Sequence, residues 1–214
     1  LFYMGSHTTG ADNSTVRNVP VPGAGYINVR REIPSLAGIR TIRFDGYSLY
    51  HALTLKLTRR FYNDLSFNTA YTLSRSQDDA SSPGPTAFES NAPQDVRNIF
   101  PGEVALSSFD HRHQFVGNGT YELPFLRGRG GWLEDVLGNW RVSGVVTVQS
   151  GAPFTVNLTE DRANIGAGPA QRPNLAGDPN LPRDQRSPEQ WFNTDAFSLQ
   201  DPLTFGSASR NVVF

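Results

Sequence analysis

The sequence contains no cysteine among its 214 residues. Disulfide bonds and thiolate metal sites are therefore excluded for this chain. No run of residues approaches the ~18–20 consecutive apolar residues that a membrane-crossing helix needs, so the sequence predicts no transmembrane helix. Charged residues make up only 18% of the chain and the net charge is −1, which argues against a nucleic acid or another polyanion as the partner.

The first residues of the chain also lack the marks of a signal peptide. Leu1 to Met4 show neither a basic start nor an apolar core, and the chain does not begin with methionine. We therefore expect both ends to be cuts through a longer protein.

The most regular feature that the sequence does have is an alternation of apolar and polar residues from Tyr47 to Arg75. Successive side chains of a β-strand point to opposite faces, so this pattern predicts a long β-hairpin with one apolar and one polar face, and Asn63-Asp64 supplies the turn. Each arm has about the ~9–11 residues that a tilted strand needs to cross a bilayer, whereas soluble strands average ~5–6. The apolar positions are Tyr47, Leu49, Leu53, Leu55 and Leu57 in the first arm and Leu65, Phe67, Tyr71 and Leu73 in the second.

Two further stretches show the same alternation. In the first, Phe115, Tyr121 and Leu123 share a face with Gly117 and Gly119, which predict a close approach or a bend in the sheet. In the second, a tryptophan and three valines alternate with polar residues. We expect four main antiparallel strands, paired in sequence order, over residues 47–62, 65–76, 111–123 and 140–150.

The remaining segments are rich in Gly, Pro, Asn and Ser and favour turns and loops. Trp132, Leu133, Val136 and Leu137 have helical spacing, and Gly138 follows where a short helix would end. Residues 76–110 form a polar loop longer than the ~12–15 residues usual in compact domains. We also expect short strands at 26–30 and 39–44, mostly loop after Phe154, and the beginning of another strand within 205–214.

The expected connections alternate in length between short turns and long loops. Outer-membrane barrels show this asymmetry, with short periplasmic turns, long extracellular loops and a girdle of aromatic residues at each interface. A soluble β-sandwich shows the same side-chain alternation, so alternation alone leaves both open. Strand length, loop asymmetry and aromatic placement favour the barrel. The aromatic residues at the short-turn end are Phe61, Tyr62, Tyr121, Phe125, Trp132 and Trp140.

Several short motifs also follow one another in a fixed order. They are Tyr47–Leu57, Arg60-Phe61, Leu65–Phe67, Tyr71–Asp79, Phe109–Phe115, Tyr121–Phe125, Trp140–Gly144, Ser150–Thr155 and Trp191–Thr194. In this succession, over most of residues 40–214, the chain resembles the barrel of Oar-like TonB-dependent receptors.

The resemblance implies a large bacterial outer-membrane barrel that is closed by an N-terminal plug and energised through TonB. We recognise no plug and no regulatory-like domain in this chain, and we expect the last strands to be missing. On this interpretation residues 1–214 are a partial receptor barrel domain. Its partners are outer-membrane lipid, its own plug, the TonB system and a ligand whose identity the sequence does not give.

Two clusters of side chains have residue types that can bind a metal ion. His111 and His113 share a strand face at a spacing compatible with a metal ion, but a polar cluster near the rim explains them better. Asp78, Asp79 and Glu89 could bind calcium, but they lack an ordered ligand loop, and a solvated acidic loop is the better interpretation. We therefore expect no metal and no cofactor.

The remaining motifs give no sign of covalent chemistry. Gly128-Arg129-Gly130-Gly131 lacks the context of a phosphate loop and is interpreted as a turn. The sequence has no G-x-S-x-G elbow, no H-E-x-x-H motif and no cysteine nucleophile. We expect no catalytic residues and no enzyme activity. Four charged residues are expected to line the barrel interior: Lys56, Arg60, Glu122 and Arg141.

The sequence therefore predicts an all-β fold, an antiparallel meander that forms part of a transmembrane outer-membrane β-barrel with long extracellular loops. The expected function is ligand binding or TonB-dependent uptake at the bacterial cell surface. The alternative is a soluble β-sandwich that serves in adhesion or carbohydrate binding.

Overall fold

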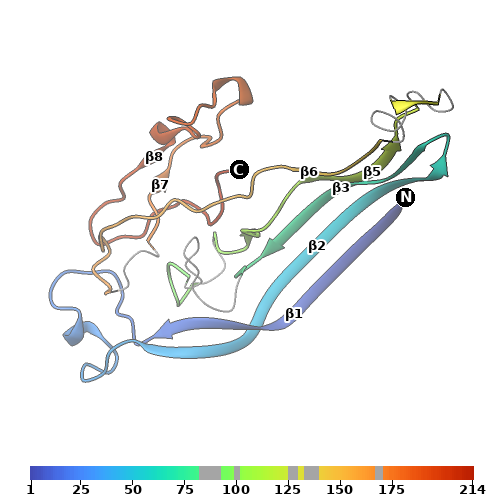
Figure 1. Cartoon of the computed structure of the whole chain (residues 1–214). Coiled ribbons are helices and arrows are strands. Elements are labelled where there is room, and N and C mark those ends of the chain that lie inside the picture. Colours follow the sequence, from blue (N-terminus) through green and yellow to red (C-terminus); the bar gives the residue numbers. More distant parts are fainter. Residues whose placement is uncertain (82–92, 99–101, 125–129, 133–139, 167–170) are drawn as a thin grey trace. The chain divides into compact units, whose positions relative to one another are not determined.

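A computed structural model describes residues 1–81, 93–98, 102–124, 130–132, 140–166 and 171–214. Its main element is one six-stranded sheet in the order β1-β2-β3-β5-β6, in which β4 pairs with β3 (Figure 1). The strands are β1 (Phe2–Arg17), β2 (Ile39–Tyr62), β3 (Leu65–Asp78), β4 (Ala105–Leu106), β5 (His113–Glu122) and β6 (Arg141–Gln149).

The four predicted main strands are confirmed as β2, β3, β5 and β6. Their ends lie within two residues of the prediction, except that β2 begins at Ile39, eight residues earlier than expected. They are neighbours in sequence order, as a meander requires. The turn between β2 and β3 is also confirmed. Asn63 and Asp64 both have positive φ, at 48° and 63°, as a two-residue turn matched to the strand twist requires, and Asn and Asp tolerate this conformation.

The N-terminal part of the chain differs from the prediction. β1 was missed because its glycine, serine and threonine residues give little hydropathic alternation. The strand expected at 39–44 is present, but it continues without a break through Gly46 as part of β2. A Cβ atom at Gly46 would lie 2.9 Å from the Ala11 carbonyl oxygen, so glycine here allows β1 to approach closely.

Two other expected strands are wrong. Residues 26–30 form a turn and the 3-10 helix η1 (Asn28–Arg30), not a strand. Residues 205–214 contribute only one isolated bridge, from Val213 to Phe154. The helix expected at 132–137 falls mainly on residues 133–139, which lie outside the described residues.

The rest of the described chain is mostly loop, as expected, with a few short elements. They are the paired strands β7 (Asn174–Leu175) and β8 (Phe197–Ser198) and the 3-10 helices η2 (Arg183–Gln185) and η3 (Thr194–Ala196). Among the described residues, no helix is long and apolar enough to cross a membrane.

The chain divides into two compact units. The strand unit comprises Leu1–Gly5, His51–Arg75 and His111–Gly151, and the loop unit comprises Ser6–Tyr50, Ser76–Asp110 and Ala152–Phe214. The described part of the strand unit buries almost nothing apolar, and every residue of β6 is exposed. The loop unit has a core, whose apolar members Ala163, Ile165, Ala196, Ala208 and Val213 are outnumbered by buried polar residues.

Two buried ion pairs cross the core of the loop unit. Arg210 pairs with Asp78, and both side chains are about 3% exposed. Arg172 pairs with Glu103 through both guanidinium Nη atoms, with an Nη1–Oε2 distance of 3.0 Å. Arg210 also donates from Nε to the Glu103 carbonyl oxygen at 3.1 Å. Three separate parts of the chain (the end of β3, residues around 103 and the C-terminal segment) are therefore held together by arginine.

Asp79 lies next to the buried Asp78 but in a different setting. Its Oδ1 accepts a hydrogen bond from the Tyr47 backbone N–H at 2.9 Å. Burial raises the pKa of Asp79 above its ordinary value of 3.8, and the hydrogen bond and the Arg210 charge only partly oppose this. The two neighbouring carboxylates thus differ. Asp78 forms an ion pair with Arg210, whereas burial disfavours the charged form of Asp79.

We expect Asp78→Asn to loosen the loop unit. Removing one partner of a buried ion pair leaves the other charge buried, which typically costs about 3–5 kcal/mol. The measurement is the protease resistance of residues 152–214 as a function of temperature, in the folded full chain. Asp79→Asn is the matched control, because its amide oxygen can still accept from Tyr47, and equal resistance of the two variants would contradict the role given to the Asp78–Arg210 pair.

The same control variant carries a pH prediction. Because the folded-state pKa of Asp79 is raised, its contribution to stability is present below pH 3.8 and is lost as the pH rises through the raised pKa. Asparagine does not titrate, so Asp79→Asn should gain stability relative to the parent chain between acidic and neutral pH. Thermal unfolding at a series of pH values measures this, and a constant difference would show that Asp79 is not the group responsible.

Candidate functional site

The strand unit presents two chemically different faces of one sheet. On the polar face, directly opposite residues of β3, β5 and β6 form rows across the strands. One row is Ser66, Thr120 and Ser143, and the next is Asn68, Asn118 and Val145. On the other face the matching rows are apolar: Leu65, Tyr121 and Val142, then Phe67, Gly119 and Gly144.

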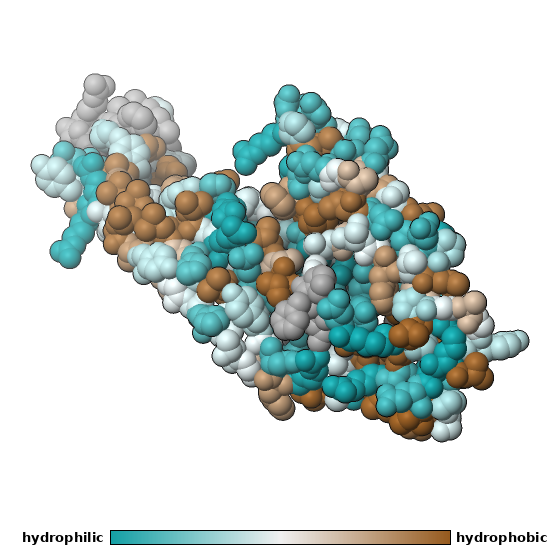
Figure 2. Space-filling view, turned by 180° about the vertical axis from the view of Figure 1, so that it is seen from behind, coloured by the Kyte–Doolittle hydropathy of each residue, from teal (hydrophilic) through white to brown (hydrophobic). Residues whose placement is uncertain are grey.

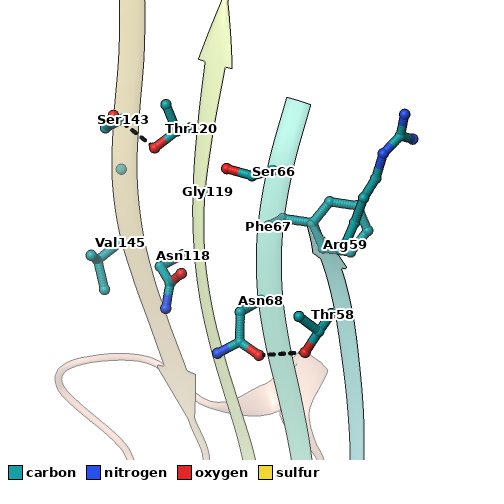
Figure 3. Close-up of a pocket in the computed structure, with 11 residues that line it drawn as sticks. Thr58, Arg59, Ser66, Phe67, Asn68, Asn118, Gly119, Thr120, Ser143 and Val145 are labelled. Carbon is teal, nitrogen blue, oxygen red and sulfur yellow. Dashed lines mark hydrogen bonds between the residues drawn. The ribbon is translucent and has the colours of Figure 1, made fainter. Parts of the chain in front are cut away.

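Side chains of neighbouring strands are joined by hydrogen bonds on the polar face. Thr58 Oγ1 donates to Asn68 Oδ1 at 2.9 Å, and the hydroxyl oxygens of Thr120 and Ser143 lie 2.9 Å apart. Figure 3 shows these two pairs, with Asn118 between Asn68 and Val145. This part of the face offers hydroxyl and amide groups with little charge, which suits contact with water, with neutral polar ligands or with a polar protein surface.

These polar rows line a shallow trough. Its volume is about 580 Å³, and it is lined by eleven residues. The lining also includes Gly119 and Gly144, which add no side chain, and Arg59 and Phe67, whose positions in the strands belong to the opposite, apolar face. In Figure 3, Arg59 and Phe67 lie together at one side of the group. The trough is a hollow bordered by the polar rows of the strand unit, and we take it as the candidate functional site.

Charged residues flank the trough near the short turn. Glu122 and Arg141 lie directly opposite each other, with an Arg141 Nε–Glu122 Oε1 distance of 3.0 Å. Lys56 and Arg60 are exposed on β2. They lie two residues from Thr54 and Thr58, so they are on the same face of the strand. The four charged residues expected on one face therefore do share the polar face.

The apolar face is exposed over most of its length. The exposed fraction of Leu55 is 56%, that of Leu57 is 59% and that of Val148 is 59%. Figure 2 shows such apolar side chains at the surface over the sheet. Large apolar patches are rare on proteins surrounded by water and indicate another solvent or a partner.

Phe67 is only partly exposed, as are Leu49 and Leu65 on the same face. It lies opposite Gly119, and a Cβ atom at Gly119 would come within 3.5 Å of the Phe67 Cβ. At Gly117 a Cβ atom would lie 3.2 Å from the ring of Phe115. The predicted close approach at both glycines is confirmed: the ring of Phe115 covers Gly117, and the Ser66 carbonyl oxygen would lie 3.3 Å from a Cβ atom at Gly119.

Aromatic residues gather at the short-turn end of the sheet. Tyr121 lies opposite Leu65, and the Leu123 backbone N–H donates to the Trp140 carbonyl oxygen at 2.8 Å. Phe61, Tyr62, Tyr121 and Trp140 are exposed there, as predicted. Trp132, in the connection from β5 to β6, is also exposed, whereas Phe125 lies outside the described residues.

His111 and His113, whose spacing is compatible with a metal ion, contact different protein groups. His111 Nδ1 lies 2.8 Å from the Ser150 carbonyl oxygen, and His113 Nδ1 lies 2.7 Å from the Tyr71 hydroxyl. Within the described ranges, no group of three metal-ligating side chains comes together. The histidines are therefore bound by protein groups in the sheet.

The acidic loop is not solvated as expected. Asp78 is buried against Arg210, and Asp79 is partly buried against Tyr47. Glu89 lies outside the described residues. The expectation failed because Arg210 lies 132 positions from Asp78, and residue order alone does not reveal such a pair. In the Gly128–Gly131 motif, Gly130 and Gly131 have positive φ, as in a turn, whereas Gly128 and Arg129 lie outside the described residues.

Two features of the strand and loop units were not predicted from the sequence. One is the second buried ion pair, Arg172 with Glu103, which joins distant segments. The other is a set of tyrosine–histidine contacts between neighbouring strands. The alternation pattern contained a signal for these contacts, because the histidines occupy positions on the apolar face.

The comparisons with known proteins give one result. A family model described as outer membrane beta barrel domain matches residues 1–214. No curated protein and no solved structure matches the chain.

Proposed function

The chain belongs to the outer membrane β-barrel domain family, and from this premise we propose how its two faces and its loop unit act. Its location is the bacterial outer membrane. The apolar face lies against lipid, and the polar face lines the interior of the barrel. The observation that carries this proposal is the exposure of leucines and valines on one face, directly behind hydroxyl and amide groups on the other.

We propose further that the barrel is a receptor or transporter of the TonB-dependent, Oar-like kind. Long connections at one end of a rigid sheet commonly carry recognition. The loop unit supports this role because its core and buried ion pairs give the loops a defined structure. A ligand bound outside the cell would contact these loops first, without any covalent step.

The trough on the polar face is then an interior surface. Its hydroxyl and amide groups can exchange hydrogen bonds with water, with a hydrated ligand or with the plug of the full-length receptor. The charged residues next to it are partly neutralised by the Glu122–Arg141 pair.

The soluble β-sandwich receives no support from the sheet arrangement. A sandwich needs two sheets whose inner faces pack together. In the part of the chain that the structure describes, the long strands form one sheet, and β7–β8 is a ribbon of two-residue strands.

Adjacent valines in β6 provide a direct test of the lipid-facing side. Val145 lies opposite Asn118 on the polar face, and Val146 lies opposite Gly117 on the apolar face. Arginine near the bilayer midplane on the lipid face costs about 2–4 kcal/mol, so Val146→Arg should be strongly destabilising and Val145→Arg nearly neutral. The measurement is urea-dependent folding of the full-length protein into phospholipid vesicles, and equal costs at both positions would overturn the assignment of the faces.

The receptor role predicts TonB-dependent depletion of a compound from the growth medium. Cells that produce the full-length protein should remove at least one compound that remains when either this protein or TonB is deleted. Mass spectrometry of the medium measures the depletion. Asp78→Asn should reduce it by loosening the loops, whereas Asp79→Asn should not. Depletion that persists without TonB would contradict an energised receptor while leaving the barrel itself unaffected.

A further inference from the structure

Three of the four histidines in the chain pack against a tyrosine of a neighbouring strand. Tyr3 of β1 stacks on His51 of β2, with ring centroids 6.0 Å apart. Tyr71 of β3 stacks on His113 of β5, with centroids 6.2 Å apart. Both pairs belong to the strand unit and lie at positions that continue the apolar face.

Each of these two pairs joins a tyrosine hydroxyl to a histidine ring nitrogen. The Tyr71 hydroxyl lies 2.7 Å from His113 Nδ1, and Tyr3 makes the same contact with His51 Nδ1. Among the described residues, the Nε2 atom of neither histidine has a hydrogen-bond partner. All four side chains are exposed. A polar nitrogen without a partner is costly in hydrocarbon, so these pairs need a surrounding that contains hydrogen-bonding groups.

The distance from these pairs to the short-turn aromatic row fits the thickness of a membrane. Phe61 follows His51 by ten residues in β2, and Tyr121 follows His113 by eight in β5. At ~3.3 Å per residue and a tilt of about 35–45°, these steps correspond to heights of roughly 19–27 Å. The outward apolar band of such barrels is about 25 Å tall and is flanked by aromatic residues at both interfaces.

The residues between the two levels are those that lipid would contact. In β2 they include Leu53, Leu55 and Leu57, all exposed.

We propose that the Tyr3–His51 and Tyr71–His113 pairs lie in the head-group layer of the outer leaflet and set the outer limit of the lipid-facing band. The inference rests on the proposed contact of the apolar face with lipid. The rings suit this layer because each has an apolar body and a polar edge. The second imidazole nitrogen is then available to a phosphate oxygen or to water.

Single spin labels along β2 test the position of this limit. The chain has no cysteine of its own, so one cysteine for labelling can be placed in turn at Leu49, Leu53, Leu55 or Leu57. The full-length protein is reconstituted in phosphatidylcholine vesicles, and power saturation compares collisions with oxygen and with a water-soluble nickel chelate. Oxygen should dominate at Leu53, Leu55 and Leu57, and the nickel chelate should dominate at Leu49. A label at Lys56 on the polar face is the matched control and should lack the lipid signature.

A second variant tests whether the pairs set the limit. Replacing Tyr3, His51, Tyr71 and His113 with leucine should shift the label at Leu49 toward oxygen contact, because the apolar band is extended. His111→Leu is the control, since His111 bonds a carbonyl oxygen instead of a tyrosine, and it should leave the label at Leu49 unchanged. The label at Leu55 reports that each variant is inserted.

The outcomes separate this inference from the proposed function. Nickel contact at Leu55 in the parent protein would overturn the lipid-facing assignment itself. If oxygen contact is equal at Leu55 and Leu49, the apolar face does lie against lipid. The outer limit of the lipid-facing band is then not at the tyrosine–histidine pairs. No shift at Leu49 in the leucine variant would show that the pairs do not set the limit.

Discussion

The sheet depends on the constraint that neighbouring residues of a strand point to opposite faces. Both faces of the strand unit are largely uncovered by the described chain, so each must be matched to its surroundings separately. The rows of leucine and valine on one side, and of serine, threonine and asparagine on the other, meet this constraint. A shift in strand register by one residue would exchange the two sets, so the side-chain pattern also fixes the pairing.

The loop unit follows a different principle. Loops carry many backbone polar groups and few large apolar side chains, so they cannot form an ordinary hydrophobic core. Here arginine side chains take over part of that role, because one guanidinium group can bind several distant carbonyl and carboxylate oxygens at once. Arg210 reaches both Asp78 and the backbone of Glu103 in this way. The arrangement gives fixed positions to segments that lack regular secondary structure.

The success of sequence-based prediction varied along the chain for physical reasons. The leucines of β2 and the valines of β6 predicted their strands because burial or lipid contact requires strict alternation. β1 was missed because glycine, serine and threonine can form a strand without producing an alternation of apolar and polar residues. The faces that line the candidate site were therefore predictable. The partners of Asp78 and His113 were not, because they depend on contacts between residues far apart in the chain.

The polar core of the loop unit also affects how its stability varies with temperature. The heat capacity of unfolding rises with the apolar surface that is exposed and falls with the polar surface. A unit whose buried residues include Gln171, Gln200, Arg172 and Arg210 exposes comparatively little apolar surface when it unfolds. We therefore expect its free energy of unfolding to vary less with temperature than that of a unit with an apolar core, so that cooling should weaken the loops less.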